Sequence, residues 1–301
     1  MTDFGYYAPI ATIFNSDYTL DIEGNKRLYD YVINGGLDGI VLMGSTGEFF
    51  SMTTQQKKQL IDIACDYIKG KCKLYVGTGC LTTEDTIELS NYALEKGADA
   101  VMIVGPYYFS LEKDNIVSYF DDVAKEIKGN IFMYNFAERT GYDLPYDVVL
   151  QVRRNNKNVI GVKDTVTQMG HTRKILTTLL KEFPNFIVYS GYDENYAHNV
   201  TSGGAGCIGA LSNICPDVFA GWGRALKEEN FKEITRYQNI VNRLMDLYDI
   251  ASPFMPVLKK ALVIKGVIKN ELCTTPFRTV NEEQVKQIEE ILADVNNLMV
   301  K

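Results

Sequence analysis

One lysine in this sequence stands where covalent chemistry on a carbonyl compound would need it. The apolar, β-type run Asn158–Val162 ends in Lys163 and Asp164, so an amine is placed where a strand leaves a hydrophobic layer and enters a loop. Desolvation disfavours a charged ammonium, so a lysine held there can offer a neutral amine near neutral pH, which attack on a ketone requires. A surface lysine just past a strand end is the alternative interpretation.

A tyrosine closes the strand-like run that precedes this one in the chain. Tyr134-Asn135 ends the run that starts at Asn130, and in a sheet whose strands pair in sequence order Tyr134 would neighbour Lys163. A phenol beside an amine can pass protons to and from a reacting centre. The alternative is that Tyr134 is a structural aromatic side chain that caps the interior of a barrel. The chain has 19 tyrosines, so this alternative stays open.

Three further loops carry polar groups suited to a small anionic substrate. Gly44-Ser45-Thr46-Gly47-Glu48 can turn backbone amides and two hydroxyls toward a carboxylate, although an ordinary turn that caps the next helix would look the same. Arg139 could grip a carboxylate or simply pair with Glu138. Gly191, Asp193 and Glu194 could receive sugar-like hydroxyls, or the two acids could cap a helix.

Together these groups predict a Schiff-base lyase. Lys163 would attack a 2-keto acid to form an iminium, whose electron demand lets the adjacent C–C bond break or form. Tyr134, relayed by Thr46, would move the protons. We expect no metal and no cofactor, because the only two histidines, His171 and His198, share no motif and the six cysteines have no CxxC spacing.

The elements that must position these residues alternate between strand and helix. Eight runs rich in Val, Ile and Tyr are strand candidates: Tyr7–Thr12, Gly39–Met43, Lys73–Val76, Ala100–Val104, Asn130–Tyr134, Val159–Lys163, Phe186–Ser190 and Gly206–Ala210. Amphipathic stretches lie between them, and no GxGxxG follows the first, so the pattern favours a (β/α)₈ TIM barrel over a doubly wound sheet. We predict a catalytic barrel over residues 1–225 and a C-terminal helical appendage over residues 226–301.

Composition sets outer limits on function. The chain has 301 residues, 46% of them hydrophobic and 23% charged, with a formal net charge of −7 and no concentrated basic block. We therefore expect neither nucleic acid nor a membrane as a partner. The start, Met1-Thr2-Asp3-Phe4, lacks the pattern of a secretory leader. The expected location is the cytoplasm, with reduced thiols.

The chain resembles the dihydrodipicolinate synthase and N-acetylneuraminate lyase family of pyruvate-dependent class I aldolases. The motifs that carry the resemblance span nearly the whole length: Tyr7–Thr12, Gly44–Glu48, Pro106-Tyr107-Tyr108, Tyr134-Asn135, Arg139-Thr140-Gly141 and Gly161-Val162-Lys163. The resemblance implies a (β/α)₈ barrel, a Schiff base between Lys163 and pyruvate, proton transfer by Tyr134, and Ser45 and Thr46 on the pyruvate carboxylate. It also implies a homotetramer of two tight dimers, in which Tyr108 crosses into the neighbouring subunit's site.

The resemblance leaves the second substrate open. Arg139 matches the arginine that the synthases use on the carboxylate of aspartate semialdehyde. Thr165, Gly191, Asp193 and Glu194 match residues with which the sialic acid lyases bind a hydroxylated tail, although those lyases have a serine where this chain has Ala210. The 2-keto-3-deoxy sugar acid aldolases resemble the chain in Tyr134-Asn135-Phe136, Lys163-Asp164-Thr165 and Gly191-Tyr192-Asp193, and Arg139 departs from their pattern.

We therefore expect an aldolase that reversibly cleaves a 2-keto-3-deoxy sugar acid to pyruvate and a hydroxyaldehyde. The alternatives within the family are 4-hydroxy-tetrahydrodipicolinate synthase and N-acetylneuraminate lyase. The alternative of another class is a non-catalytic barrel that binds a keto acid.

Overall fold

Eight parallel strands follow one another in sequence order around a closed barrel in the computed structural model, which describes residues 4–300. The predicted (β/α)₈ barrel is confirmed. The start of the chain at Met1–Asp3, where we expect no leader, lies outside the described residues. The strands are β1 (Gly5–Pro9), β2 (Gly39–Leu42), β3 (Lys73–Gly77), β4 (Ala100–Val104), β5 (Ile131–Asn135), β6 (Val159–Asp164), β7 (Ile187–Ser190) and β8 (Gly206–Ile208).

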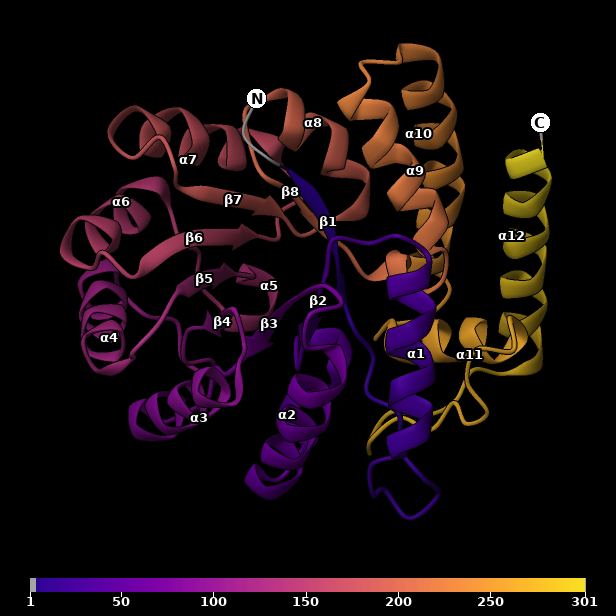
Figure 1. Cartoon of the computed structure of the whole chain (residues 1–301), viewed down its shortest axis with the longest axis horizontal. Helices are drawn as coiled ribbons and strands as arrows, with labels where there is room; N and C mark the ends of the chain where they lie inside the picture. The colour runs from indigo at the N-terminus through magenta and orange to yellow at the C-terminus, as the bar shows by residue number, and fades with distance from the viewer. Residues whose placement is uncertain (1–3, 301) are drawn as a thin grey trace. The chain divides into compact units, whose positions relative to one another are not determined.

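Residues 74–208, together with Phe4 and Gly5, form one compact unit. In Figure 1, its longer helices follow one another beside strands β4 to β7, and each packs on its neighbour. The helices of this unit are α3 (Thr83–Lys96), α4 (Lys113–Glu126), α5 (Ala137–Thr140), α6 (Tyr146–Asn155), α7 (Met169–Glu182) and α8 (Tyr196–Thr201), with a 3-10 turn η3 (Asp193–Asn195).

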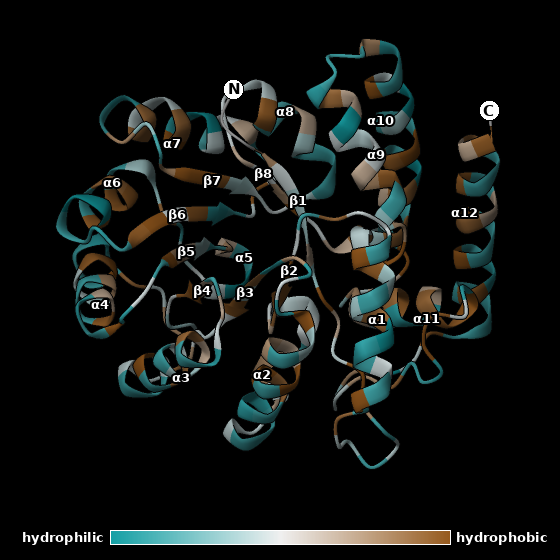
Figure 2. Cartoon of the chain, viewed as in Figure 1, coloured by the Kyte–Doolittle hydropathy of each residue, from teal (hydrophilic) through white to brown (hydrophobic). Residues whose placement is uncertain are grey.

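The strands of this unit are buried on both faces, as a parallel sheet covered by helices requires. Every residue of β4 and β5 is buried, and Figure 2 shows β6 and β7 as largely hydrophobic ribbons beside helices with one polar side. Gly97 ends α3 with a φ of 109°, a left-handed conformation that glycine adopts without strain. The sequence places this glycine just before the strand candidate Ala100–Val104, and the helix ends there.

Residues 6–73 and 209–300 form the second compact unit. Its helices are α1 (Ile22–Asn34), α2 (Thr54–Ile68), α9 (Pro216–Lys227), α10 (Phe231–Met245), α11 (Met255–Ile264) and α12 (Glu282–Val300), and its 3-10 turns are η1 (Ser45–Gly47), η2 (Phe49–Ser51), η4 (Ala210–Asn213) and η5 (Asp246–Asp249). Helix α10 packs against both α9 and α12. Thr53 and Gln56 form a capping box at the start of α2.

Two local predictions need correction in this unit. The first strand runs over Gly5–Pro9 rather than Tyr7–Thr12. Beyond it, two backbone amides donate to side chains instead of to a neighbouring strand: the Ala11 amide donates to Asn213 and the Ile13 amide to Asn25. The helical spacing of the sequence predicts Phe231 on the apolar stripe of α10, but this side chain is 79% exposed. It occupies the first turn of the helix, before the buried stripe that includes Tyr237 and Val241.

The strands all lie before residue 209, and the described chain after it forms helices and loops. The predicted division into a barrel over 1–225 and an appendage over 226–301 stays a prediction. Over residues 4–300, no helix combines the length and the apolar character needed to cross a bilayer.

Candidate active site

Lys163 and Tyr134 lie side by side on adjacent strands. The register of β5 and β6 pairs Tyr134 with Lys163 directly, and the Lys163 Nζ lies 4.4 Å from the centroid of the Tyr134 ring. Both side chains are buried, at 5% exposure for Lys163 and 6% for Tyr134. The structure therefore keeps the amine out of bulk water and within reach of the phenol.

Aromatic rings lie on the other side of Lys163. The register of β6 and β7 pairs it with Tyr189, whose ring lies 5.6 Å from Phe132 and 6.4 Å from Tyr75. The hydroxyls of Tyr75 and Tyr189 are 3.4 Å apart. This cluster is buried, so Lys163 has a buried tyrosine beside it on β7 as well as on β5.

Arg139, in the loop after β5, lies near the Tyr134 ring by way of Phe136. It lies on the short helix α5, and its guanidinium stands 5.3 Å from the centroid of Phe136, whose ring is 6.0 Å from that of Tyr134. Arg139 itself is exposed. Its planar cation is thus held on an aromatic face with its hydrogen-bond donors accessible to solvent.

Thr165 and Gly191 face each other just beyond β6 and β7. A Cβ on Gly191 would lie 1.9 Å from the Thr165 Oγ1, so only glycine fits without moving the threonine. The Thr165 hydroxyl is buried and finds no hydrogen-bond partner among residues 4–300. A buried hydroxyl in that state costs free energy unless something else, such as a ligand, satisfies it.

The two acids after Gly191 lie in different environments. Asp193 is fully buried within η3, whereas Glu194 is exposed. The sequence predicts that both contact substrate hydroxyls, and the structure places them in unequal positions to do so.

The predicted anion site at Gly44–Glu48 forms the 3-10 turn η1, in which Ser45 and Thr46 are half-buried. Glu48 follows in a left-handed conformation (φ 57°, ψ 33°) and is completely buried. Its Oε1 lies 2.5 Å from the Lys259 Nζ, and its Oε2 accepts hydrogen bonds from the backbone amide and hydroxyl of Thr274. The loop that carries the two hydroxyls is thereby tied to α11 and the segment after it.

Tyr108 stands apart from the other candidates. It follows β4, has a φ of 107° and is 89% exposed, with the neighbouring Phe109 ring packed edge-on against it. Two aromatic side chains are thus exposed side by side, and the first of them adopts an unfavourable backbone conformation.

A polar cluster that the sequence did not reveal lies next to Lys163. Asp164 is buried and accepts from Asn135 at 2.9 Å and from Thr172 at 2.6 Å, and its other close neighbour is the His171 Nδ1 at 3.0 Å. His171 also forms an ion pair with Asp143 at 2.9 Å. Sequence reasoning assigns His171 and Asp143 no role, because the seven and eight residues that separate them from Asp164 and Asn135 match no motif.

The same cluster has perturbed charges. Burial opposes a charge on His171, but its ion pair with Asp143, its hydrogen bond to Asp164 and the negative charge of both carboxylates outweigh this and raise the pKa of His171 to about 10. Burial likewise opposes the charge on Asp143, and the hydrogen bonds from His171 and Asn135 outweigh it and lower the pKa of that carboxyl. Such shifts cluster at functional sites.

The metal and thiol predictions concern the histidine, cysteine and acidic side chains. All six cysteines are free thiols. Within residues 4–300, no group of three or more His, Cys, Asp or Glu side chains is arranged to hold a metal ion.

The fold and the site are those of a closed parallel barrel with a buried lysine at the end of its sixth strand, and the comparison with known proteins identifies the family. Residues 4–295 match the Dihydrodipicolinate synthetase family, and the chain belongs to it. The family resemblance predicted from the sequence motifs is confirmed.

Two relatives from Escherichia coli K12 match over nearly their whole length. One is YagE, to which a 2-dehydro-3-deoxy-D-gluconate aldolase activity is attributed; it is 31% identical over 96% of this chain and 95% of its own. The other is YjhH, to which a 2-dehydro-3-deoxy-D-pentonate aldolase activity is attributed; it is 29% identical over 96% of each chain. The crystal structure of YagE in complex with pyruvate superposes with a TM-score of 0.95 and 30% identity, covering 98% of this chain and 99% of that one.

A synthase is also among the relatives. The 4-hydroxy-tetrahydrodipicolinate synthase of Protochlamydia amoebophila is 28% identical over 97% of this chain and 96% of its own. Two of the three activities that the sequence left open are thus represented at similar identity.

Proposed function

We propose that this protein is a class I aldolase that reversibly cleaves a 2-keto-3-deoxy sugar acid to pyruvate and a hydroxyaldehyde through a Schiff base on Lys163. The observation that carries the proposal is the buried Lys163 amine beside the Tyr134 ring on the adjacent strand. The attributed activities of YagE and YjhH, and the pyruvate bound to YagE, support the choice of substrate.

The chemistry needs one amine and one proton carrier. The Lys163 amine adds to the C2 carbonyl of the keto acid, and the carbinolamine loses water to give an iminium. Tyr134, relayed by Thr46, removes the proton from the C4 hydroxyl, and the C3–C4 bond breaks. The aldehyde leaves, and the electron pair of the broken bond moves toward the iminium to form an enamine. Protonation at C3 and hydrolysis then release pyruvate and restore the amine. No cofactor and no metal take part in these steps.

The remaining candidates would bind rather than react. Ser45 and Thr46 would hold the pyruvate carboxylate through their hydroxyls and backbone amides. The unpartnered Thr165 hydroxyl, with Gly191 leaving room beside it, would accept or donate a hydrogen bond to the sugar chain. Asp193, Glu194 and Arg139 would bind its more distant oxygens.

One observation favours a second candidate within the family. Arg139 presents accessible guanidinium donors on the Phe136 ring, which suits the carboxylate of aspartate semialdehyde and so a 4-hydroxy-tetrahydrodipicolinate synthase. N-acetylneuraminate lyase is less well supported, because Ala210 offers no hydroxyl where those lyases have one. Incubation of the enzyme and pyruvate with a panel of aldehydes separates the three by the aldehyde that is consumed.

Borohydride trapping tests the mechanism. With pyruvate and borohydride, we expect a reduced adduct on Lys163 in the intact-mass and peptide spectra; its absence would favour a non-catalytic keto-acid-binding barrel. Lys163→Ala should lower kcat/KM by a factor on the order of 10³ or more, and Tyr134→Phe by about 10². Lys181→Ala, at an exposed lysine of α7, is the matched control. Turnover by Lys163→Ala at a comparable rate would refute the mechanism.

We also propose a cytoplasmic homotetramer of two tight dimers, in which Tyr108 enters the neighbouring subunit's site. The exposed Tyr108 and Phe109 side chains support an interface at this loop. Light scattering of the protein and of Tyr108→Ala tests it: the wild type should have four times the chain mass, and loss of activity in a tetrameric variant would support a role of Tyr108 in the site.

A further inference from the structure

Four side chains beside the proposed aldolase site form a closed ring of polar contacts. The Asn135 Nδ2 donates to Asp143 at 2.7 Å and to Asp164 at 2.9 Å. On the other side, the His171 Nδ1 lies 3.0 Å from Asp164 and its Nε2 lies 2.9 Å from Asp143. We call Asn135, Asp143, Asp164 and His171 the two-carboxylate ring, because two acids alternate in it with two side chains that face both of them.

The ring requires a doubly protonated histidine. A carboxylate oxygen only accepts hydrogen bonds, so an unprotonated ring nitrogen within 3.0 Å of it would set two lone pairs against each other. Both nitrogens of His171 have such a neighbour. The contact to Asp164 is a hydrogen bond and the contact to Asp143 is an ion pair, and the two carboxylates are the charged groups that face the imidazole.

The members of the ring connect the reacting strands to the loop that carries Arg139. Asn135 follows Tyr134 at the end of β5, and Asp164 follows Lys163 at the end of β6. Asp143 closes the segment 136–143, whose next amide, that of Leu144, also donates to the Asn135 Oδ1. His171 extends the contacts from the first turn of α7.

We propose that a permanently charged His171 is a positioning residue of this enzyme: it ties Asp143 to Asp164 and so holds the segment 136–143, with Arg139, over the strand ends that carry Tyr134 and Lys163. The inference rests on the proposed aldolase function and deepens it. It assigns His171 to binding of the aldehyde half of the substrate, since the bond from Asn135 to Asp164 persists without the histidine and keeps the two reacting strands joined.

The protonation state is tested first, on the unmodified protein. With ¹³Cε1-labelled histidine, the chain gives only two imidazole signals, and the variant His198→Gln identifies that of His171. We expect the His171 signal at its imidazolium position throughout pH 6 to 9. A neutral His171 ring at pH 8 would overturn the proposal.

Kinetics test the positioning role. In His171→Gln and Asp143→Asn, we expect KM for the aldehyde to rise about tenfold, with the rate of borohydride-trapped pyruvate adduct changed by less than about twofold. His198→Gln, at an exposed histidine whose contacts are to Ser202 in its own helix end, is the matched control and should change neither. An unchanged aldehyde KM, or equal losses in both measurements, would overturn the role of His171.

The outcomes separate this inference from the function on which it rests. If the wild type itself forms no adduct with pyruvate, the aldolase proposal falls. If it forms the adduct but His171 is neutral or the aldehyde KM is insensitive, only the positioning proposal falls.

Discussion

Two groups of buried charges hold the two loops that carry candidate site residues, and they are built differently. Glu48 and Lys259 form a dry, one-to-one pair in which both side chains are 0% exposed. The two-carboxylate ring has two acids for one imidazolium and opens toward solvent, with side-chain exposures of 0% for Asp164, 20% for His171 and 44% for Asp143. One is a sealed pair and the other a graded cluster.

This difference in solvent exposure determines how each group responds to the loss of one member. Both members of the sealed pair have further polar contacts: Lys259 also donates to the Leu272 carbonyl at 2.7 Å, and Glu48 also accepts from Thr274. Removing one partner leaves a charge in a dry interior, which is expensive. In the two-carboxylate ring, Asp143 is in contact with water, so the loss of one member should cost less free energy. The net charge of the ring, however, depends on the protonation of one imidazole.

The sealed pair also supports a strained backbone. Glu48 is not a glycine, yet it adopts left-handed angles directly after the Ser45–Gly47 turn. Such a conformation costs of order 1 kcal/mol or more and persists only where surrounding contacts impose it. The buried contacts of its carboxylate supply that constraint.

Lys259→Met, which breaks the sealed pair, should have the largest effect on stability. The methionine fills a similar volume but leaves Glu48 buried without its cation, so we expect a loss of about 3 to 5 kcal/mol in the free energy of unfolding, measured by urea denaturation. The double variant Glu48→Gln with Lys259→Met should recover part of that loss, because the orphaned charge is gone. A cost below about 1 kcal/mol for the single change would mean that the pair is hydrated.

His171→Gln should be milder and should alter the pH dependence instead. Removing the charged donor should cost about 2 kcal/mol at pH 6.5, in the range of hydrogen bonds to charged groups. The pKa of His171 is raised from its ordinary 6.5 to about 10 in the folded state. Its contribution is therefore fully present below about pH 6.5 and is lost progressively as the pH rises toward 10.

Urea midpoints measured at intervals from pH 6 to 10 check this. The wild type should lose stability across that interval more steeply than His171→Gln, and the two curves should converge at the alkaline end. Parallel curves would show that the charge on His171 does not support the fold. His198→Gln should follow the wild type throughout.

The strands that carry these clusters can be predicted from the sequence, because each strand is recognised from residues within or next to it. A run such as Ala100–Val104 needs only its own β-branched side chains and the glycine cap before it to be recognised, and the structure matches it to the residue. Lys163 and Tyr134 are found the same way, since each ends such a run and sequence-order pairing places them side by side.

The clusters themselves are not readable, because their members meet only in the folded chain. Glu48 and Thr274 are separated by 226 positions, and neither Lys259 nor His171 stands in a motif that marks it as buried or paired. The sequence favours His171 as an ordinary surface or helix residue. Its position in the first turn of α7 agrees, but its two carboxylate neighbours follow from the register of β5 and β6 and from the path of the loop to Asp143.

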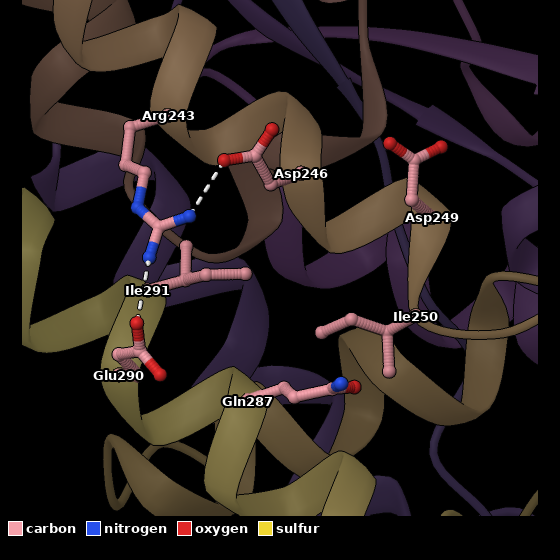
Figure 3. A pocket seen from close by; sticks show the side chains of 7 residues that line it. All are labelled: Arg243, Asp246, Asp249, Ile250, Gln287, Glu290 and Ile291. Atoms are coloured by element: carbon pink, nitrogen blue, oxygen red, sulfur yellow. Dashed lines mark hydrogen bonds and ion pairs between the residues drawn. The ribbon is translucent and has the colours of Figure 1, made fainter.

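A third group of charges, around Arg243, is more exposed to solvent than the other two. Arg243 on α10 lies 2.6 Å from Asp246, 2.8 Å from Asp294 and 3.6 Å from Glu290, and Figure 3 shows its guanidinium between Asp246 and Glu290. Arg243, Asp246 and Glu290 border a surface pocket of about 320 Å³. The three acids are 48% to 74% exposed, so water screens their attraction for the arginine.

Arg243→Ala should therefore have the smallest effect. We expect a loss of at most about 1 kcal/mol in the free energy of unfolding, in spite of three acidic partners, because exposed ion pairs must fix their side chains and gain little in water. The gap from the wild type should narrow further in 1 M salt, where the screening length falls to about 3 Å. A salt-independent loss above about 2 kcal/mol would place Arg243 with the sealed pair and show that burial of the cation, rather than exposure of its acids, determines its strength.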